Sequence, residues 1–430
     1  MPDLHLRHVT AVTLDDQNTL LEDATIVIAD GRIVYLGAAG AAPAPHRDDR
    51  IFSADGQVAL PGFINAHTHL GMTLFRGAAD ELPLQAWLKE KIWPVEARMT
   101  REDVYWASLL GIAEMLRAGV TTFCDMYWHV EAVAEAVRES GIRACLSGVV
   151  IGVLPGAETM FARAVERVTS LIAEGHPRIV PCFGPHAPYT VPTPMLQRII
   201  EAAAALGVGI NTHLSETAGE VRESVEAFGL TPIARMQQVG LFSVPVTAAH
   251  CVHPTREEID LLAEARVGVV HCPSSNMKLG SGIAPLPALL EAGVTVGLGT
   301  DGAGSNNTLD MLREVRTAAL LHKVGGDPTA ISAVDALALA TRGSAAALRL
   351  PDLGSLEVGK IADIILLDFA QPHLTPQGRV LSDLVYAAYA SDVDTVIVHG
   401  EILMEHRRLL TLDEPRIRAR VNEAAARLFG

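Results

Sequence analysis

The sequence lacks the features of a membrane protein or a nucleic-acid-binding protein. No run of about 18 uninterrupted apolar residues occurs, so no membrane-spanning helix is expected. Basic residues are in the minority, with 34 Lys and Arg against 50 Asp and Glu, and the formal charge of −16 disfavours binding to phosphate backbones and anionic membranes. The first residues do not have the basic and then apolar stretches of a signal peptide. We therefore expect a cytoplasmic protein that binds neither nucleic acid nor membrane.

Cysteine is also scarce. The five cysteines are scattered, odd in number and never in Cys-x-x-Cys spacing: Cys124, Cys145, Cys182, Cys251 and Cys272. This pattern argues against a disulfide framework and a thiolate zinc knuckle, and it favours reduced core residues. Three catalytic signatures are absent as well, namely H-x-E with P-C-x-x-C of the zinc cytidine deaminases, H-E-x-x-H of the metalloproteases and G-x-S-x-G of the serine hydrolases.

The composition is that of a globular enzyme. Hydrophobic residues make up 49% and charged residues 20% of the 430 residues, which allows a large core and two or three domains. Short alternating β-segments occupy residues 9–36, with a hairpin signal at Asp30-Gly31. Similar segments return after Gly354. We predict that residues 1–57 and 358–430 together form one small β-sandwich domain.

Between these ends, residues 58–357 alternate short apolar segments with long helical ones. This alternation predicts βα units and an α/β fold with a parallel sheet, and eight strands are the number that a (β/α)₈ TIM barrel needs. The predicted strands are 60–69, 120–126, 144–150, 179–186, 208–214, 246–252, 267–275 and 295–301.

Polar side chains follow nearly every predicted strand. They stand at or just beyond the end of the apolar run: His67, His69, Asp125, His186, His213, His250, Ser275, Asn276 and Asp301. Because barrel enzymes build their sites from the carboxyl ends of strands, we expect these side chains to form one site.

The pair His67 and His69 lies two residues apart on a strand, so both imidazoles point to the same face. An H-x-H pair alone is more often two solvent or core histidines. His213 and Asp301 occupy equivalent ends of later strands, and the four residues give three nitrogens and one carboxylate for a catalytic metal. Zinc is the expected ion, although iron and manganese accept similar ligands.

Four motifs give the chain a clear resemblance to the amidohydrolase superfamily. They are Pro61-Gly62-Phe63-Ile64-Asn65-Ala66-His67-Thr68-His69, Thr212-His213-Leu214-Ser215-Glu216, Ala249-His250-Cys251 and Gly299-Thr300-Asp301-Gly302. Residues 354–363 also look like that superfamily's return to its β-sandwich. His186 stands where a bridging carbamylated lysine would be needed, so one metal ion is expected rather than two.

These residues have expected catalytic roles. Asp301 would accept the proton of the attacking water, and Glu216 would protonate the ring nitrogen beside the attacked carbon. His250 would hold the attacking oxygen by a hydrogen bond. Two alternatives remain open: Glu216 could only complement a helix dipole, and His250 could be a satisfied core histidine.

Within the superfamily, local motifs resemble the deaminases of 5′-methylthioadenosine and S-adenosylhomocysteine, a sister group of the triazine chlorohydrolases. The motifs are residues 72–77, 87–88, 93–96, 184–189, 274–280 and 301–307, the last of which contains Ser305. The resemblance implies a purine nucleoside substrate, with Glu96 accepting both ribose hydroxyls, His186 contacting the nucleoside, and Glu216, Asp301 and Ser305 beside it. Trp87 could stack on the ligand, although simple packing is the more common role.

One position departs from this group. Members that accept S-adenosylhomocysteine can carry an arginine after the third strand, where this chain has Gly148. A site without that arginine loses a charge-assisted contact to the amino-acid carboxylate, so 5′-methylthioadenosine is the favoured substrate. Arg163 is a possible substitute, and adenosine itself remains a candidate.

The sequence also contains two patterns that resemble nucleotide-binding loops, and the fold allows other functions. A G-x-G-x-x-G match at residues 297–302 and a G-x-x-x-x-G-K match at residues 354–360 lack the flanking elements of nucleotide-binding loops, and we interpret them as the aspartate loop and a turn. The scaffold could instead act on guanine, a pterin or a chlorinated triazine, but Glu96 favours a ribose. A non-catalytic homologue would be expected to have lost ligands that are present here. The Trp, Met and apolar content would also permit a homo-oligomer.

Overall fold

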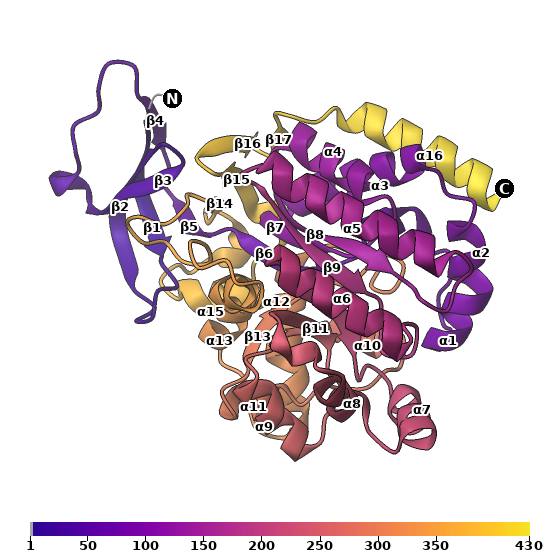
Figure 1. Ribbon diagram of the computed structural model, residues 1–430. Coiled ribbons are helices and arrows are strands. Elements are labelled where there is room, and N and C mark those ends of the chain that lie inside the picture. Colours follow the sequence, from indigo (N-terminus) through magenta and orange to yellow (C-terminus); the bar gives the residue numbers. More distant parts are fainter. Residues whose placement is uncertain (1–2) are drawn as a thin grey trace.

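The computed structural model describes residues 3–430, which form an eight-stranded parallel barrel and a separate nine-stranded mixed sheet (Figure 1). The barrel strands follow one another in chain order: β6 (Phe63–Thr68), β7 (Val120–Asp125), β8 (Arg143–Val150), β9 (Ile179–Pro185), β10 (Ile210–Leu214), β11 (Val246–His250), β12 (Gly268–His271) and β13 (Thr295–Leu298). A hydrogen bond from Asp301 N–H to the His67 carbonyl (3.0 Å) links the end of the series to its beginning. The predicted (β/α)₈ barrel is confirmed.

The first predicted strand, residues 60–69, is wrong as a single element. The chain forms β5 (Gln57–Pro61) in the mixed sheet and then β6 in the barrel, with Gly62 between them. Gly62 N–H donates to the Asp363 carbonyl, and a Cβ at this position would lie 2.2 Å from the Thr121 side chain. Only glycine fits where the chain crosses from one sheet to the other.

The strand predicted over residues 267–275 is too long. Strand β12 ends at His271, and Pro273 begins helix α10 (Pro273–Lys278). Proline suits the first turn of a helix and ends strand pairing because it has no N–H to donate. Ser275 and Asn276 therefore lie on a helix that follows the strand, still at the carboxyl edge of the barrel.

The mixed sheet combines both chain ends, as predicted. Its strands are β1 (Leu4–Val12), β2 (Leu20–Ala29), β3 (Arg32–Ala38), β4 (Arg50–Ser53), β5, β14 (Ile364–Asp368), β15 (Val393–Val398), β16 (Glu401–Glu405) and β17 (Arg408–Leu409). The predicted hairpin is present between β2 and β3, where Asp30 and Gly31 have φ values of 49° and 75°. Apolar side chains from β1–β5, β14 and β15 form a core of their own within this sheet.

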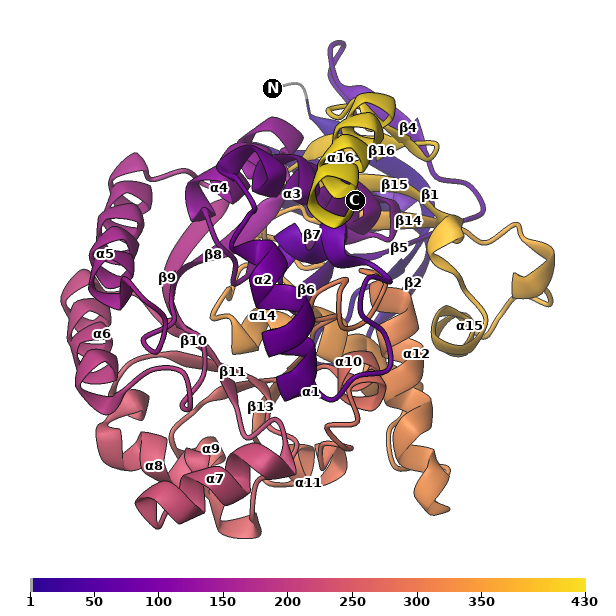
Figure 2. The same cartoon turned by 90° about the vertical axis from the view of Figure 1, so that its right-hand side faces the viewer.

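Helices surround the barrel. They are α1 (Leu84–Ala86), α2 (Trp93–Glu96), α3 (Arg101–Arg117), α4 (Val130–Ser140), α5 (Ala157–Glu174), α6 (Thr193–Leu206), α7 (Ala218–Phe228), α8 (Pro232–Val239), α9 (Arg256–Glu264), α10, α11 (Leu286–Glu291), α12 (Met311–Leu321), α13 (Ala333–Ala338), α14 (Ser344–Ala347), α15 (Val380–Tyr386) and α16 (Glu414–Phe429). In Figure 2, α5, α6 and α8 follow the outer edge of the barrel, while α1 and α2 lie in front of it. Among the helices of residues 3–430, none is both long and apolar enough to cross a membrane.

Two polar contacts join distant parts of the chain. Helix α16 lies beside α3 (Figure 1), where Arg427 pairs with Asp103. A buried ion pair between Arg143 of β8 and Asp363, just before β14, connects the barrel to the mixed sheet, with a nitrogen–oxygen distance of 3.1 Å. All five cysteines are buried and free, as predicted.

Candidate active site

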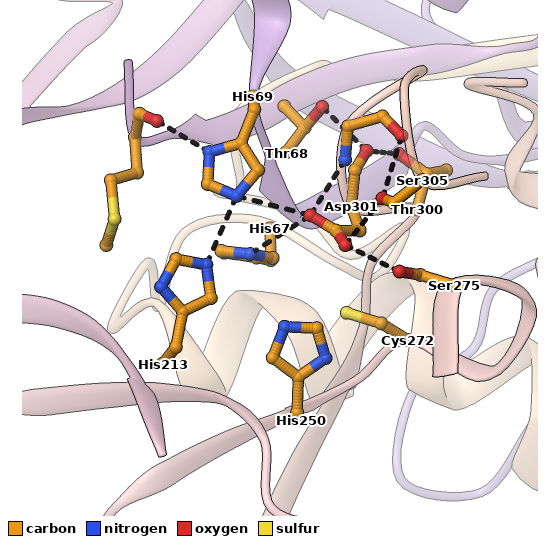
Figure 3. A network of polar contacts seen from close by, with 12 residues as sticks. His67, Thr68, His69, His213, His250, Cys272, Ser275, Thr300, Asp301 and Ser305 are labelled. Atoms are coloured by element: carbon orange, nitrogen blue, oxygen red, sulfur yellow. Dashed lines mark hydrogen bonds and ion pairs between the residues drawn. The ribbon is translucent and has the colours of Figure 1, made fainter. Parts of the chain in front are cut away.

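Three histidines and one aspartate meet at the carboxyl edge of the barrel. His67 lies on β6, His69 follows it, His213 lies on β10, and Asp301 comes three residues after β13. His69 Nε2 lies 3.1 Å from His213 Nε2 and 3.2 Å from Asp301 Oδ1, and His67 Nε2 lies 3.6 Å from the same oxygen. Figure 3 shows His67 and His69 turned toward the Asp301 carboxylate and His213 turned toward His69. The structure therefore brings together the four residues predicted to bind a metal.

The backbone orients two of these rings. His69 Nδ1 lies 2.6 Å from the Met126 carbonyl and His213 Nδ1 lies 2.6 Å from the His186 carbonyl. A carbonyl only accepts, so both Nδ1 atoms carry the proton and each Nε2 of the neutral rings is bare. Two bare nitrogens 3.1 Å apart repel each other unless a proton or a metal cation lies between them. Neither nitrogen of buried His67 has a hydrogen-bond partner in residues 3–430. This donor set fits a divalent metal ion.

Burial and charge act in opposite directions on these groups. Burial lowers the pKa of His67 to about 4 and lowers the pKa of His213 well below its ordinary value, which keeps both rings neutral. Burial opposes charge on His69 too, but the hydrogen bond and negative charge of Asp301 outweigh it and raise the pKa of His69 to about 9. Asp301 is also desolvated, yet its contacts with His67 and His69 hold the pKa of its carboxyl well below the usual range.

Asp301 is held in an unusual backbone conformation. Its φ is 60°, in the left-handed region that is costly for most residues. Its Oδ2 accepts hydrogen bonds from Ser275 Oγ (2.6 Å) and Ser305 Oγ (2.7 Å), and its Oδ1 accepts from Gly302 N–H (2.8 Å). Oδ1 is also the oxygen nearest the histidines. These bonds fix the direction of the carboxylate.

Ser305 occupies a different place from the one predicted. We expected it to contact the substrate, but its hydroxyl is engaged by Asp301 and by the Gly302 carbonyl (3.1 Å). It does not line the site cavity. Ser305 lies behind the aspartate because the turn after β13 folds it back on the loop, and it supports Asp301 rather than reaching the substrate.

Glu216 and Glu220 divide two tasks between them. Thr217 is the N-cap of α7, so Glu216 precedes the helix, while Glu220 in the first turn accepts the backbone N–H groups of Ser215 (3.0 Å) and Glu216 (2.7 Å). The helix-terminal contact predicted as an alternative for Glu216 therefore belongs to Glu220. The Glu216 side chain faces the site, where Ser281 Oγ donates to its Oε1 (3.3 Å), and burial raises the pKa of its carboxyl.

His250 completes the inner wall of the site. It ends β11 with a φ of 74°, and its Nδ1 donates to Asn276 Oδ1 (2.8 Å). Its ring stacks on that of His213, with centroids 5.4 Å apart, and its Nε2 lies 3.8 Å from Glu216 Oε2. The free nitrogen thus points between the metal ligands and the glutamate.

These groups line a small cavity of about 50 Å³ under α1 and α2. His186, Glu216, His250 and Asp301 share it with Trp87 and Glu96, which lie on the covering segment. Trp128 Nε1 donates to Glu96 Oε2 (3.1 Å), and burial raises the pKa of that glutamate. Trp87 is buried and its Nε1 has no partner in the described part of the chain. Glu96 therefore lines the same cavity as His69, His213 and Asp301.

A larger cavity of about 980 Å³ adjoins the first. The two share Trp93, Glu96, Tyr127, Trp128 and Val149, and the larger one is also lined by Gly148 and Arg163. A side chain at position 148 would not point into the inner site, because its Cβ would meet Val168 and Ala164 of α5 at 3.0 and 3.2 Å. Gly148 thus borders the outer cavity through its backbone.

Two contributors to the site were not foreseen. Ser281 contacts Glu216, and Trp128 contacts Glu96. Trp128 comes three residues after the strand-end aspartate Asp125, so its position was a usable signal. Ser281 lies on an irregular loop after α10, where no periodicity marks which side chain turns inward.

Comparison with known proteins agrees with this geometry. The model of the amidohydrolase family matches residues 58–403. The chain belongs to the amidohydrolase family. Two relatives named 5-methylthioadenosine/S-adenosylhomocysteine deaminase are similar over nearly their whole length. The protein of Pelotomaculum thermopropionicum is 48% identical over 429 residues, covering 100% of this amidohydrolase and 99% of the relative. The protein of Moorella thermoacetica is 52% identical over 400 residues, which cover 93% of this chain and 94% of the relative.

Solved structures of the same kind superimpose closely on this amidohydrolase. A zinc-bound adenosine deaminase from Xanthomonas campestris has a TM-score of 0.94 and 38% identity, covering 99% of this chain and 98% of that one. Atrazine chlorohydrolase from Arthrobacter aurescens, also with zinc, has a TM-score of 0.90 and 28% identity, covering 98% and 100%. The family match and the deaminase names of the relatives confirm the prediction of a hydrolytic deaminase.

Proposed function

We propose that this amidohydrolase converts 5′-methylthioadenosine to 5′-methylthioinosine and ammonia, and that it also accepts related adenosine nucleosides. One observation carries the proposal: His69, His213 and Asp301 of the cluster line the same cavity as Glu216 and Glu96. This arrangement suits a purine whose amino group faces the cluster and whose ribose faces Glu96. The names of the relatives point to the same substrates.

We assign one zinc ion to His67, His69, His213 and Asp301. Three neutral nitrogens and a carboxylate are a preferred zinc donor set, and the similar adenosine deaminase contains zinc. At the position of a bridging lysine stands His186, whose Nδ1 is engaged by the Thr190 hydroxyl at 3.1 Å. This favours one metal ion. When bound, zinc makes the attacking water acidic enough to act at neutral pH.

The protein groups then move two protons. The water adds to the carbon that bears the amino group, and the Asp301 carboxylate accepts its proton. Glu216 in its acid form donates to the neighbouring ring nitrogen, which burial favours by raising its pKa. His250 Nε2, which lies 3.8 Å from Glu216 Oε2, holds the attacking oxygen by a hydrogen bond. The proton on Asp301 passes to the amino group, the carbon–nitrogen bond breaks to release ammonia, and the remaining hydroxyl proton returns to Glu216 as the carbonyl forms.

Glu96 recognises the sugar. A carboxylate offers two acceptor oxygens to the two neighbouring ribose hydroxyls. The Trp128 indole N–H holds one of these oxygens from the side, so the carboxylate keeps one orientation. We assign His186, which lines the same cavity, to contact with the nucleoside.

The 5′ substituent enters the outer cavity beyond Glu96. Position 148 offers no cation there, which favours the neutral methylthio group. Arg163 lines the same cavity, is exposed and makes no ion pair with any residue from 3 to 430, so it is the available contact for the carboxylate of S-adenosylhomocysteine.

A steady-state assay of the zinc-loaded protein tests the proposal. Ammonia release is followed with 5′-methylthioadenosine, S-adenosylhomocysteine, adenosine and guanine. We expect turnover of the adenosine compounds, and we expect Glu216→Gln to lower kcat by about 10²–10⁴-fold. Glu223→Gln, an exposed change on α7, is the matched control. Turnover of guanine with no activity on any adenosine compound, or no activity on any of the four, would contradict the proposal.

A further inference from the structure

A second cavity lies at the opposite end of the barrel from the proposed active site. It has a volume of about 450 Å³ and is lined by the amino-terminal parts of β9 and β10 and by the ends of α5, α6 and α14. We call it the floor cavity. Its inner wall carries three cysteines from neighbouring strands: Cys124 of β7, Cys145 of β8 and Cys182 of β9. Deamination makes no use of these thiols.

The thiols are tied together by two polar side chains. Asn211 Nδ2 lies 3.4 Å from Cys124 Sγ and 3.3 Å from Ser147 Oγ, and Ser147 Oγ lies 3.3 Å from Cys182 Sγ. Since Ser147 already accepts from Asn211, its hydroxyl proton is free to go to Cys182. Both sulfurs therefore receive hydrogen bonds, but only the Cys182 thiolate is favoured. Hydrogen bonds to Cys145 and Cys182, together with burial, raise the pKa of the Cys124 thiol well above its ordinary value, so Cys124 keeps its proton until a cation displaces it.

An independent feature points to a ligand. Asn211 is 1% exposed, and its Oδ1 has no hydrogen-bond partner within residues 3–430. The residue lines the floor cavity. An unsatisfied buried acceptor costs about 1–3 kcal/mol, so the site is built to face a donor or a cation.

The cavity also lets a ligand reach the sulfurs. Cys182 is 9% exposed, Cys145 4% and Cys124 1%, whereas Cys251 and Cys272, which lie elsewhere, are 0% exposed, so Cys182 is the sulfur that a ligand meets first. A disulfide between Cys124 and Cys182 is disfavoured by the strand β8 between them. Cys145 pairs with both Cys124 and Val180, so Cys182 lies two strands away from Cys124 and two residues further along, with Cα atoms more than about 9 Å apart against a limit of about 7 Å for a disulfide.

The chemistry of the lining selects the kind of cation. No Asp, Glu or His lines the floor cavity, and its one charged residue is Arg349. Hard divalent ions prefer oxygen ligands, whereas thiolates select soft metals such as Cu(I). Two thiolates with a monovalent cation carry one net negative charge, which Arg349 balances. A hydrogen bond from Cys124, and then one from Ser147, also lower the pKa of Cys182.

We propose that the floor cavity binds a soft monovalent cation, of the Cu(I) class, between the thiolates of Cys124 and Cys182. Each cysteine loses its proton to solvent as its sulfur–metal bond forms, so binding one cation releases up to two protons. Asn211 Oδ1 faces the same ion as a weaker oxygen contact.

Silver(I), a redox-inert monovalent probe, tests this in chloride-free buffer on the zinc-loaded protein. Native mass spectrometry and calorimetry should show one tightly bound silver per chain. Cys124→Ser and Cys182→Ser should each weaken binding at least tenfold, and Cys251→Ser should leave it unchanged. Equal affinity in all three variants, or no binding by the unaltered protein, would overturn the proposal and leave the cavity to solvent.

A second measurement needs no variant. Iodoacetamide should alkylate Cys182 of the folded protein faster than Cys251 or Cys272, and one equivalent of silver should protect Cys182. Alkylation of Cys182 at the same rate with and without silver would contradict the proposed site, even if a serine variant failed to fold.

Discussion

Glu216 and Glu220 show how two carboxylates of one loop acquire different chemistry. Glu220 accepts two backbone N–H groups and so fixes the turn from β10 into α7. Glu216 is thereby left free to point at Ser281 and His250. The orientation of Glu216, the proposed general acid, therefore depends on Glu220, which does not itself line the site cavity.

The burial of Glu220 predicts a pH dependence of stability. Desolvation raises the pKa of its carboxyl to about 7, from an ordinary value of 4.5. The folded state binds this proton more tightly than the unfolded state, so the stabilisation is complete below pH 4.5 and is lost as the pH rises through 7. The loss between these values is about 3 kcal/mol.

This is measured as the difference in unfolding free energy between the unaltered protein and Glu220→Gln, at pH 4.5 and at pH 7.5. The unaltered protein should lose stability relative to Glu220→Gln as the pH rises from 4.5 to 7.5. Glu223→Gln, which alters an exposed neighbour on α7, should give a difference that is flat with pH. A flat difference for Glu220→Gln as well would disprove the raised pKa.

At the scale of secondary-structure elements, Glu96 depends on the segment that covers the site. A π-helical turn, Trp87–Ile92, directly precedes α2 and turns Trp87 and Glu96 toward the same cavity. π-Helical turns are rare in proteins, and those that occur often lie at functional sites. This turn was not predicted, because no residue in the segment 84–96 marks a π-helical turn locally.

Replacement of Glu96 tests sugar recognition. Glu96→Gln should lower kcat/KM for 5′-methylthioadenosine by about 10- to 100-fold, since a neutral amide has one acceptor oxygen and hydrogen bonds to a charged group contribute about 1.5–3 kcal/mol. The penalty for a 2′-deoxy substrate should be smaller in the variant than in the unaltered enzyme. Glu90→Gln, on the exposed side of the same segment, serves as control. An unchanged 2′-deoxy penalty would remove Glu96 from the ribose.

The loop after β13 depends on a glycine. A Cβ at Gly299 would lie 2.9 Å from both the backbone N and O of His67, neither of which can turn aside. Gly299→Ala should therefore shift His67, weaken zinc retention and cost about 1–3 kcal/mol of stability. Gly40→Ala has open space around it and should do neither. Dialysis against a chelator measures zinc retention, and thermal unfolding measures stability. Unchanged values for Gly299→Ala would show that the backbone at Gly299 can move away from His67 without cost.

The metal cluster and the barrel were predictable because they follow from periodicity. Residues two apart on a strand share a face, and parallel strands end at one edge, so His67, His69, His213 and Asp301 had to converge. The break at Gly62 and the placement of Ser305 were not predictable. Both are decided by contacts between parts of the chain far apart in sequence, or within an irregular loop, and neither leaves a local signal.

For the whole molecule, the barrel and the mixed sheet share the buried ion pair of Arg143 and Asp363. Asp363 accepts from Arg143 Nε (3.1 Å) and Nη2 (3.2 Å) and from His399 N–H (2.7 Å). Arg143→Met should cost about 3–5 kcal/mol because it leaves the carboxylate buried without its cation. The double variant Arg143→Met/Asp363→Leu should recover much of that loss. Denaturant unfolding measures the free energy of unfolding of each protein. Equal values for Arg143→Met and the unaltered protein would show that the ion pair does not join the two sheets.

The central claim is that one zinc ion, held by four residues at the barrel edge, supports deamination of an adenosine nucleoside. The most direct test is to titrate zinc into the metal-free protein while ammonia release from 5′-methylthioadenosine is recorded. Activity should rise linearly from zero and stop rising at one equivalent, and His67→Ala should neither retain zinc nor gain activity. A rise that continues to two equivalents, or full activity before any metal is added, would contradict the account.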